Sequence, residues 1–166
     1  MPVVKSAQII TLVERRCAER GLRLTPLRRE VLQLVAAAGG PVKAYDLLER
    51  LGRRRTSSSA PPTVYRALDF LLAHHFIHRL ESLNAYICCV QPDDRHAIGH
   101  SGQFLICERC AQVTEVPAGN IAGSVRDAAK REDFAPRKQV IEVYGECRKC
   151  RSPKTRRPMR RAAARA

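Results

Sequence analysis

The sequence predicts an α+β fold made of two small domains and a basic tail. Residues 1–73 carry apolar side chains at helical spacing, whereas stretches near 77–89, 104–116 and 138–144 have the composition of short β-strands. The net charge of +14 is unevenly spread. Residues 1–91 hold 14 Lys and Arg against 7 Asp and Glu, residues 92–150 hold 9 of each, and residues 151–166 hold 7 basic residues and no acidic ones. We expect an N-terminal winged helix-turn-helix domain (1–91), a small α/β dimerisation domain (92–150) and a disordered tail (151–166).

Helical periodicity indicates three helices before residue 52. Thr25 and Pro26 give the second of them an N-cap followed by proline at the first helical position, and Gly39-Gly40-Pro41 ends it. The buried faces are expected to carry Ile10, Val13 and Cys17 in the first helix, Leu27, Val31, Leu34, Val35 and Ala38 in the second, and Ala44, Leu47, Leu48 and Leu51 in the third.

A basic run, residues 53–60, separates these helices from a fourth. The run has no apolar face and is either a solvated linker or a loop that touches phosphate groups. Pro61-Pro62 then begins a helix whose exposed side includes Thr63, Tyr65 and Arg66. Its buried stripe is Val64, Ala67, Leu68, Leu71 and Leu72.

The exposed residues of this fourth helix suit contact with DNA. Arg66 can bond bidentately to guanine or to phosphate, and Tyr65 offers a ring for a thymine methyl and a hydroxyl for phosphate. Such a helix matches the second helix of a helix-turn-helix, which enters the major groove. A plain helical domain explains the buried stripe equally well, but the net charge of +7 over residues 1–91 favours a polyanion.

Residues 77–80 and 84–89 alternate like two strands of a hairpin, which would complete a winged helix. Alternation puts Cys89 on one face of the returning strand and Cys88 on the other, so Cys88 is excluded from the chemistry of Cys89. The C-terminal domain is expected to contain strands at 104–106, 111–116 and 138–144. A helix between them is marked by Ile121, Ala122, Val125, Ala128 and Ala129.

The seven cysteines indicate metal or redox chemistry. Residues 1–8 lack the apolar core of a signal peptide, and no apolar run approaches the ~20 residues of a membrane span, so a cytoplasmic protein without disulfides is expected. Two pairs have the spacing C-x-x-C, and four thiolates suit a closed, tetrahedral, structural Zn²⁺ site. The alternatives are two unconnected reduced pairs or a thiol redox switch. The four cysteines are Cys107, Cys110, Cys147 and Cys150.

A second, mixed ligand set is His78, Cys89, His100 and Glu115. One thiolate and one carboxylate neutralise Zn²⁺, and two imidazoles complete a tetrahedron. The thiolate favours zinc, since hard ligand sets of nitrogen and oxygen suit Fe²⁺ or Mn²⁺. His96 is an alternative ligand. A zinc hydrolase, with Glu115 as base and the other three as ligands, is a rival interpretation of the same residues.

Four segments resemble the ferric uptake regulator family, over roughly residues 7–150. Residues 61–72 (Pro-Pro-Thr-Val-Tyr-Arg-Ala-Leu-Asp-Phe-Leu-Leu) are similar to its recognition helix, and residues 81–86 (Glu-Ser-Leu-Asn-Ala-Tyr) to its wing in the zinc uptake regulator branch. Residues 104–110 (Phe-Leu-Ile-Cys-Glu-Arg-Cys) and 147–150 (Cys-Arg-Lys-Cys) complete the pattern. The iron and peroxide branches usually carry a His-rich run before the first C-x-x-C, and residues 96–100 contain only two histidines, which weakens an iron assignment.

The resemblance implies a dimeric repressor that binds double-stranded operator DNA when zinc is bound and controls zinc uptake genes. Tyr65 and Arg66 become DNA-reading positions. The four C-x-x-C cysteines become ligands of a structural zinc, and the mixed set becomes the sensing site, so that two zinc ions are expected per chain. No enzyme activity, small-molecule substrate or membrane is expected. An iron-responsive regulator, or a two-zinc DNA-binding protein that does not sense zinc, are the alternatives.

Overall fold

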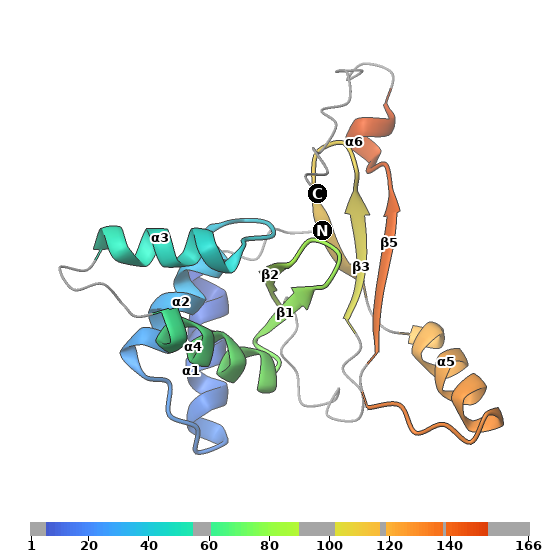
Figure 1. The fold of residues 1–166 in the computed structure, drawn as a ribbon, viewed down its shortest axis with the longest axis horizontal. Helices are drawn as coiled ribbons and strands as arrows, with labels where there is room; N and C mark the ends of the chain where they lie inside the picture. Colours follow the sequence, from blue (N-terminus) through green and yellow to red (C-terminus); the bar gives the residue numbers. More distant parts are fainter. Residues whose placement is uncertain (1–5, 55–60, 90–101, 117–118, 138, 153–166) are drawn as a thin grey trace. The chain divides into compact units, whose positions relative to one another are not determined.

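The structure is a computed structural model that describes residues 6–54, 61–89, 102–116, 119–137 and 139–152 (Figure 1). The chain divides into two compact units, Met1–His100 with Pro136–Gln139, and Ser101–Ala135 with Val140–Ala166, called here the first and second unit. The domain boundary predicted after residue 91 falls among residues outside these ranges and stays a prediction. Of the predicted tail, only residues 151 and 152 are described. In the described ranges, no helix is long and apolar enough to cross a bilayer.

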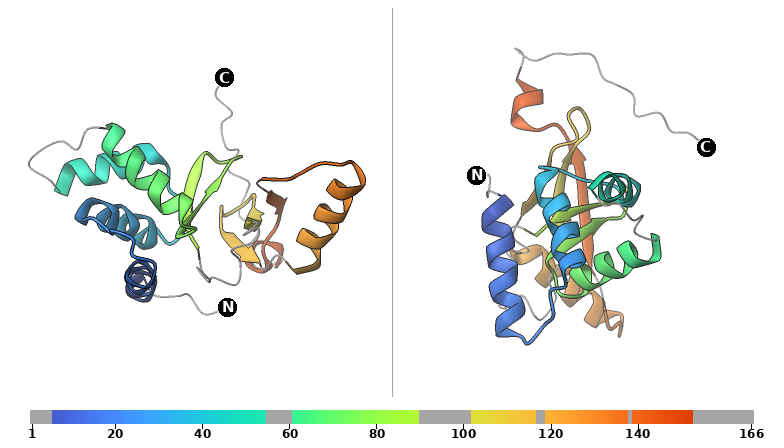
Figure 2. Two further views of the ribbon diagram at one scale, coloured as in Figure 1. Left: turned by 90° about the horizontal axis from the view of Figure 1, so that it is seen from below. Right: turned by 90° about the vertical axis from the view of Figure 1, so that its left-hand side faces the viewer.

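Helix α2 lies at the centre of the first unit and packs against its other three helices (Figures 1 and 2). The helices are α1 (Ser6–Glu19), α2 (Pro26–Ala37), α3 (Ala44–Arg54) and α4 (Pro61–Ala73). Helix α2 begins as predicted, because the Thr25 hydroxyl accepts a hydrogen bond from the Arg28 amide at 3.4 Å. The Arg28 guanidinium also stacks on the ring of Phe70 in α4, 3.6 Å from its centroid. This cation–π contact joins α2 to α4 beside the apolar core.

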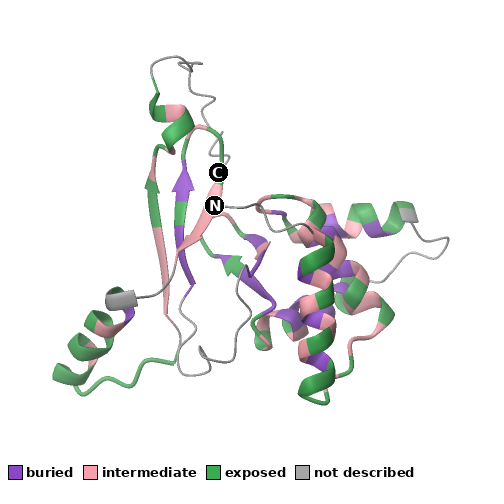
Figure 3. Ribbon diagram, turned by 180° about the vertical axis from the view of Figure 1, so that it is seen from behind, coloured by how far each residue is buried: buried purple, intermediate pink, exposed green. Residues whose placement is uncertain are grey.

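Helix α4 has the buried and exposed faces that its periodicity predicts (Figure 3). Its buried residues are Val64, Ala67, Leu68 and Leu71, while Leu72, predicted in the same stripe, is only partly buried. Thr63, Tyr65 and Arg66 are exposed. Helix α4 therefore presents polar and aromatic groups to solvent, as the second helix of a helix-turn-helix does.

Helix α4 ends in a left-handed residue that is not glycine. The His75 amide donates to the Leu72 carbonyl at 3.0 Å and the Phe76 amide to the Leu71 carbonyl at 2.9 Å. This is the hydrogen-bond pattern of a C-terminal cap, which glycine usually completes. Here His75 takes that position with φ of 57°. The cap turns the chain directly from α4 into the wing.

The wing is an antiparallel hairpin of β1 (Ile77–Leu80) and β2 (Ala85–Cys88). A bridge between Val42 and Tyr86, with N–H···O distances of 2.8 and 2.9 Å, ties it to the segment before α3. The predicted winged helix-turn-helix is therefore confirmed.

The second unit contains a three-stranded sheet in the order β4-β3-β5. Its elements are β3 (Gly102–Cys107), β4 (Val113–Val116), α5 (Gly119–Arg131), β5 (Val140–Gly145) and α6 (Arg148–Arg151). β3 pairs antiparallel with β4 and parallel with β5. Phe104 and Ile106 of β3 and Ala122 of α5 are buried, at 1, 4 and 4% exposure. The mixture of helices and sheets in the two units confirms the α+β class.

Three details of the second unit differ from the prediction. The second strand begins at Val113 and not at residue 111, because Ala111 is left-handed with φ of 57° and belongs to the preceding turn. The last strand begins at Val140 and not at residue 138. Helix α6 was not predicted, since a four-residue helix is too short to produce a periodic pattern.

The strained cap of α4 makes a testable prediction about stability. We expect His75→Gly to unfold at higher urea concentration than His75→Ala, with a difference of about 0.5–1 kcal/mol, because only glycine adopts positive φ without a Cβ penalty. Both variants lose the imidazole, so His75→Ala is the matched control. Equal unfolding midpoints by circular dichroism would contradict the assignment of strain to this residue.

Candidate metal centres and DNA-binding face

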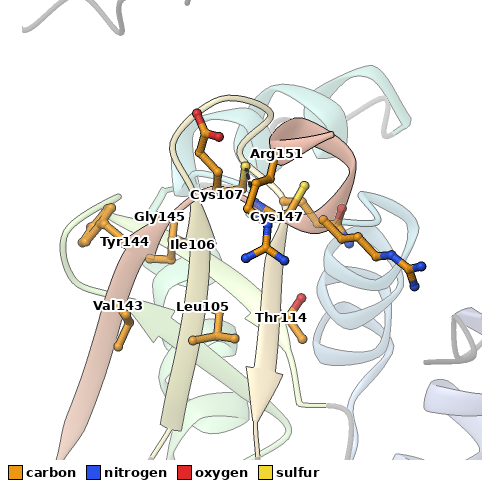
Figure 4. Close-up of a pocket in the computed structure, with 12 residues that line it drawn as sticks. Leu105, Ile106, Cys107, Thr114, Val143, Tyr144, Gly145, Cys147 and Arg151 are labelled. Atoms are coloured by element: carbon orange, nitrogen blue, oxygen red, sulfur yellow. Dashed lines mark hydrogen bonds between the residues drawn. The ribbon is translucent and has the colours of Figure 1, made fainter. Parts of the chain in front are cut away.

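Four cysteines converge at one end of the sheet in the second unit. β3 ends at Cys107 and a tight turn leads to Cys110, while β5 ends at Gly145, just before Cys147. Because β3 and β5 run parallel and are paired as far as Cys107 and Gly145, both cysteine pairs emerge at the same end. Figure 4 shows Cys107 and Cys147 together there, above a row formed by side chains of the sheet. The predicted four-cysteine cluster is thus present.

The sulfur positions fit a tetrahedral metal ion. The Sγ atoms of all four cysteines lie within 4.8 Å of one another, and those of Cys110 and Cys147 are 3.7 Å apart. Zn–S bonds of about 2.3 Å place the sulfurs of a tetrahedron about 3.8 Å apart, whereas a disulfide needs about 2.05 Å. All seven cysteines are free thiols. The donor set therefore suits Zn²⁺ and leaves no open coordination position.

Backbone hydrogen bonds hold the first C-x-x-C turn against the second. The Ala111 amide donates to the Cys107 carbonyl at 2.8 Å and closes the turn. The Glu108 amide donates to the Gly145 carbonyl at 2.9 Å, and the Cys147 amide donates to the Cys107 Sγ at 3.3 Å. The sulfur of Cys107 thus accepts a backbone donor as a thiolate ligand does.

The thiols of this cluster compete for ionisation. Burial acts to raise the pKa of Cys107, but backbone donors from Cys147, Cys110 and Arg109 outweigh it and bring that pKa down to about 6. Burial and the neighbouring thiols raise the pKa of Cys150 to about 12. A backbone hydrogen bond from Cys150 also lowers the pKa of Cys147, whereas the pKa of Cys110 is raised, so ionisation is favoured at two of the thiols and opposed at the other two. A dication between the sulfurs removes this opposition, which is the electrostatic reason that such a cluster needs a metal.

His78 and Cys89 come together in the first unit. His78 lies on β1 with 8% exposure, and Cys89 follows β2 and is completely buried. An imidazole nitrogen of His78 lies within 4.8 Å of the Cys89 Sγ. The register pairs His78 with Ile87, so Cys89, two residues further on, shares their face. Cys88 lies on the opposite face in the apolar core, where burial raises its pKa to about 12.

The other two members of the mixed set are contributed by other segments of the chain. Glu115 is on β4 in the second unit, half-buried and opposite Phe104. His100, and the alternative ligand His96, are outside the described residues. The mixed set as a whole therefore stays a prediction, supported so far by its pair in the first unit.

The expected DNA-reading residues share the exposed side of α4. Tyr65 is 46% exposed, and Thr63 and Arg66 are exposed beside it near the N-terminal end of the helix. Most of the basic run at 53–60 lies outside the described ranges.

Sequence reasoning missed a cation on the wing. Arg79 projects from β1, where its Nε lies 3.2 Å from Glu81 and its Nη2 donates to Asn84 Oδ1 at 3.1 Å. It stands opposite Tyr86 across the hairpin. A signal was available, because Arg79 is the polar residue between the buried His78 and Leu80 and so faces solvent by alternation.

Comparison with known proteins identifies the family. A sequence profile described as "Ferric uptake regulator family" matches residues 19–144. The chain belongs to this family. The resemblance inferred from its recognition helix, wing and cysteine pairs is thereby confirmed.

Several relatives with 39–48% identity are named as zinc regulators. The zinc uptake regulation protein of Escherichia coli (strain K12) is 40% identical over 150 residues, which cover 90% of this chain and 85% of that protein. The crystal structure of holo XcZur is 48% identical, covers 85% of this chain and 95% of its own, and superposes with a TM-score of 0.77. A zinc uptake regulator complexed with zinc and DNA is 39% identical, with coverage of 89% and 95% and a TM-score of 0.80.

For this family member, the four-cysteine cluster predicts that one substitution abolishes metal retention in the second unit. We expect Cys107→Ser to purify without the tightly held zinc and to lose dimers or solubility, because metal-binding energy at such a site is folding energy. Cys17→Ala, which removes a thiol from the core of the first unit, is the control and should keep its zinc. The measurements are zinc per chain and sedimentation. Zinc retained by Cys107→Ser at the wild-type level would exclude Cys107 as a ligand.

Proposed function

We propose that this chain is a zinc-responsive transcriptional repressor of the ferric uptake regulator family, acting in the cytoplasm. As a dimer carrying its regulatory zinc, it would bind operator DNA of zinc uptake genes. The observation that carries the proposal is the coexistence of two donor sets of different character. One is a closed cluster of four thiols in the second unit, and the other includes a buried His78–Cys89 pair directly behind the wing. The similarity to zinc uptake regulators supports it.

Two zinc ions per chain are proposed, with different roles. The four cysteines would hold a structural ion. His78, Cys89, His100 and Glu115 would hold a regulatory one. The thiolate of Cys89 makes the second set softer than the nitrogen and oxygen sets that suit Fe²⁺, which favours a zinc regulator over an iron regulator.

The proposed ligands connect the parts of the protein that must act together. His78 and Cys89 belong to the wing and its exit, so they are rigidly joined to the recognition helix α4 through the cap at residues 74–76. Glu115 belongs to the sheet of the second unit. A bound zinc would supply a four-coordinate link among these groups. Because two of its ligands belong to the wing and its exit, this link would restrict how each recognition helix can be arranged relative to the second unit.

The energetic requirement on this link is considerable. Shifting a population from 1:99 to 99:1 in favour of the DNA-binding arrangement needs about 10⁴-fold preferential binding, or roughly 5.5 kcal/mol. By linkage, operator DNA must tighten zinc binding by the same factor as zinc tightens DNA binding. In a two-fold dimer the recognition helices must also meet major grooves about 34 Å apart.

The second unit suits a dimer interface. Leu105, Val143 and Tyr144 of its sheet are 47, 50 and 45% exposed, and all three line a hollow of about 350 Å³ (Figure 4). Ile121 and Val125 of α5 are exposed at 52 and 39%. Apolar residues gathered in this way usually mark a protein–protein contact. The zero net charge of residues 92–150 removes repulsion between two copies.

The rival functions fit less well. A zinc hydrolase needs an open coordination position for water, and a set of four side-chain ligands closes it. A thiol switch at Cys107 and Cys110 would first require loss of the metal that the four sulfurs fit.

Substitution of neighbouring thiols tests the sensing site. We expect Cys89→Ser to remain folded, dimeric and loaded with about one zinc per chain, but to lose zinc-dependent operator binding, because only the regulatory set loses a ligand. Cys88→Ala is the matched control and should keep the response. The assays are zinc content after mild chelation and operator binding at buffered free zinc. A zinc response that survives in Cys89→Ser and is lost in Cys88→Ala would place the ligand one residue away.

Substitution on α4 tests the DNA-reading face. Arg66→Ala should weaken operator binding by ~1–3 kcal/mol per base contact and reduce affinity for random DNA much less. Arg23→Ala, an equal change of charge at an exposed position between α1 and α2, should leave the ratio of the two affinities unchanged. Removal of residues 153–166 should weaken all DNA binding alike and lower its salt dependence. An unchanged ratio in Arg66→Ala would mean that Arg66 does not read sequence.

A further inference from the structure

Arg109 lies inside the first C-x-x-C turn and is more buried than its neighbours. Its side chain is only 15% exposed, whereas Glu108 and Cys110 on either side are exposed. A guanidinium withdrawn this far from water needs charged or hydrogen-bonding partners. Two of its polar partners lie at the second cysteine pair, Cys147 and Cys150.

The first partner is the backbone of a ligand. Nη1 of Arg109 donates to the Cys150 carbonyl at 2.8 Å. Cys150 lies in the four-residue helix α6, where the last carbonyls have no donor within the helix. A cation at a helix C-terminus also meets the negative end of the helix dipole. The bond therefore satisfies an orphan acceptor and fixes the backbone that carries the fourth sulfur.

The second partner strengthens the same connection. Nη1 of Arg109 lies 3.6 Å from Oε1 of Glu146, the residue before Cys147. Arg109 thus bonds on both sides of the second cysteine pair, before Cys147 and at Cys150. Together with the Glu108–Gly145 hydrogen bond, these contacts join the two turns without any metal.

We infer that Arg109 is a positioning residue that keeps Cys150 among the metal ligands and thereby makes the four-thiolate site slow to release zinc. This inference rests on the proposed structural zinc. Cys150 is the ligand whose segment has the least support, since α6 is one turn long and follows the last strand of the sheet. A chelator gains access when one thiolate leaves, and a backbone tethered by Arg109 returns that thiolate to its place.

The consequence is a division of labour between the two sites. When the free zinc concentration in the cell changes, only the exchangeable mixed set would gain or lose its ion. The four-thiolate site would release its ion too slowly to follow that change. Without Arg109, the four-thiolate site would release its ion faster, and the difference in exchange rate between the two sites would shrink.

The test measures zinc release from the full-length protein after the exchangeable ion has been removed. A coloured chelator reports the release rate of the remaining zinc at fixed pH. Arg109→Gln should release it about 10-fold faster, because changing a group behind metal ligands typically lowers metal affinity ~10–100-fold and a lower affinity is expected to raise the release rate. The release rate of Arg109→Lys should be intermediate, because an ammonium group keeps the positive charge but lacks the forked hydrogen-bond donors of the guanidinium. Arg148→Gln, an equal charge change at an exposed position on α6, should match the wild type.

A second readout separates positioning from general destabilisation. With Co²⁺ in the site, Arg109→Gln should keep the thiolate charge-transfer spectrum of the wild type, and its unfolding midpoint with metal bound should change little. If Arg109→Gln does not fold, the zinc release rates of Arg109→Lys and Glu146→Gln are compared with that of the wild type instead. Both variants are expected to release zinc faster than the wild type.

The outcomes distinguish this inference from the proposed function. Wild-type release rates in Arg109→Gln, or equal acceleration in Arg148→Gln, would overturn the role of Arg109 and leave the structural zinc in place. Faster zinc release from Arg109→Gln would also overturn it if the metal-bound variant unfolds at a lower midpoint than the wild type and the loss of zinc follows that unfolding. A wild-type protein that keeps no zinc after mild chelation would instead refute the structural zinc itself.

Discussion

Parallel pairing of β3 with β5 is the constraint on which the second unit depends. Parallel strands cannot be joined by a tight turn, so the chain between them has to cross over, and α5 lies in that crossover. The pairing brings Cys110 and Cys147, 37 positions apart in sequence, to within 3.7 Å. In the described part of this unit, few apolar side chains are fully buried. A metal at the sheet end would therefore contribute a large share of the folding free energy.

The first unit achieves its shape by other means. Apolar packing around α2 and the cation–π contact between Arg28 and Phe70 hold α4 in place without metal. The basic side chains on its surface are partly neutralised, since Arg29 and Arg53 pair with Glu14 and Glu49. Exposed pairs of this kind add little stability. Their effect is to leave fewer uncompensated cations on the surface of the first unit.

Most of the fold follows from patterns in the sequence, and most of what was missed depends on long-range partners. The helical period identified the exposed side of α4, and the spacing of the cysteines identified their cluster, because both signals are local. The left-handed turn at Ala111 and the helix α6 gave no periodic signal. Arg109 looked like an ordinary charged residue, since its partners Glu146 and Cys150 lie about 40 positions away and meet it only through the strand pairing. The proposed ligand role of Glu115 likewise has no signal in sequence spacing and rests on the family resemblance.

Two adjacent thiols show how strand geometry assigns chemistry. Cys88 and Cys89 have the same side chain and nearly the same burial, with 7 and 0% exposure. Cys88 faces the apolar core, where burial alone raises its pKa to about 12, so it has no accessible thiolate at neutral pH. Cys89 faces His78, and a metal held between an imidazole and a sulfur stabilises the thiolate in a way that apolar neighbours cannot. A shift of the β1–β2 register by one residue would exchange the two environments. The hairpin register, fixed by the turn at 81–84 and by the bridge from Val42 to Tyr86, therefore decides which of the two thiols shares a face with His78.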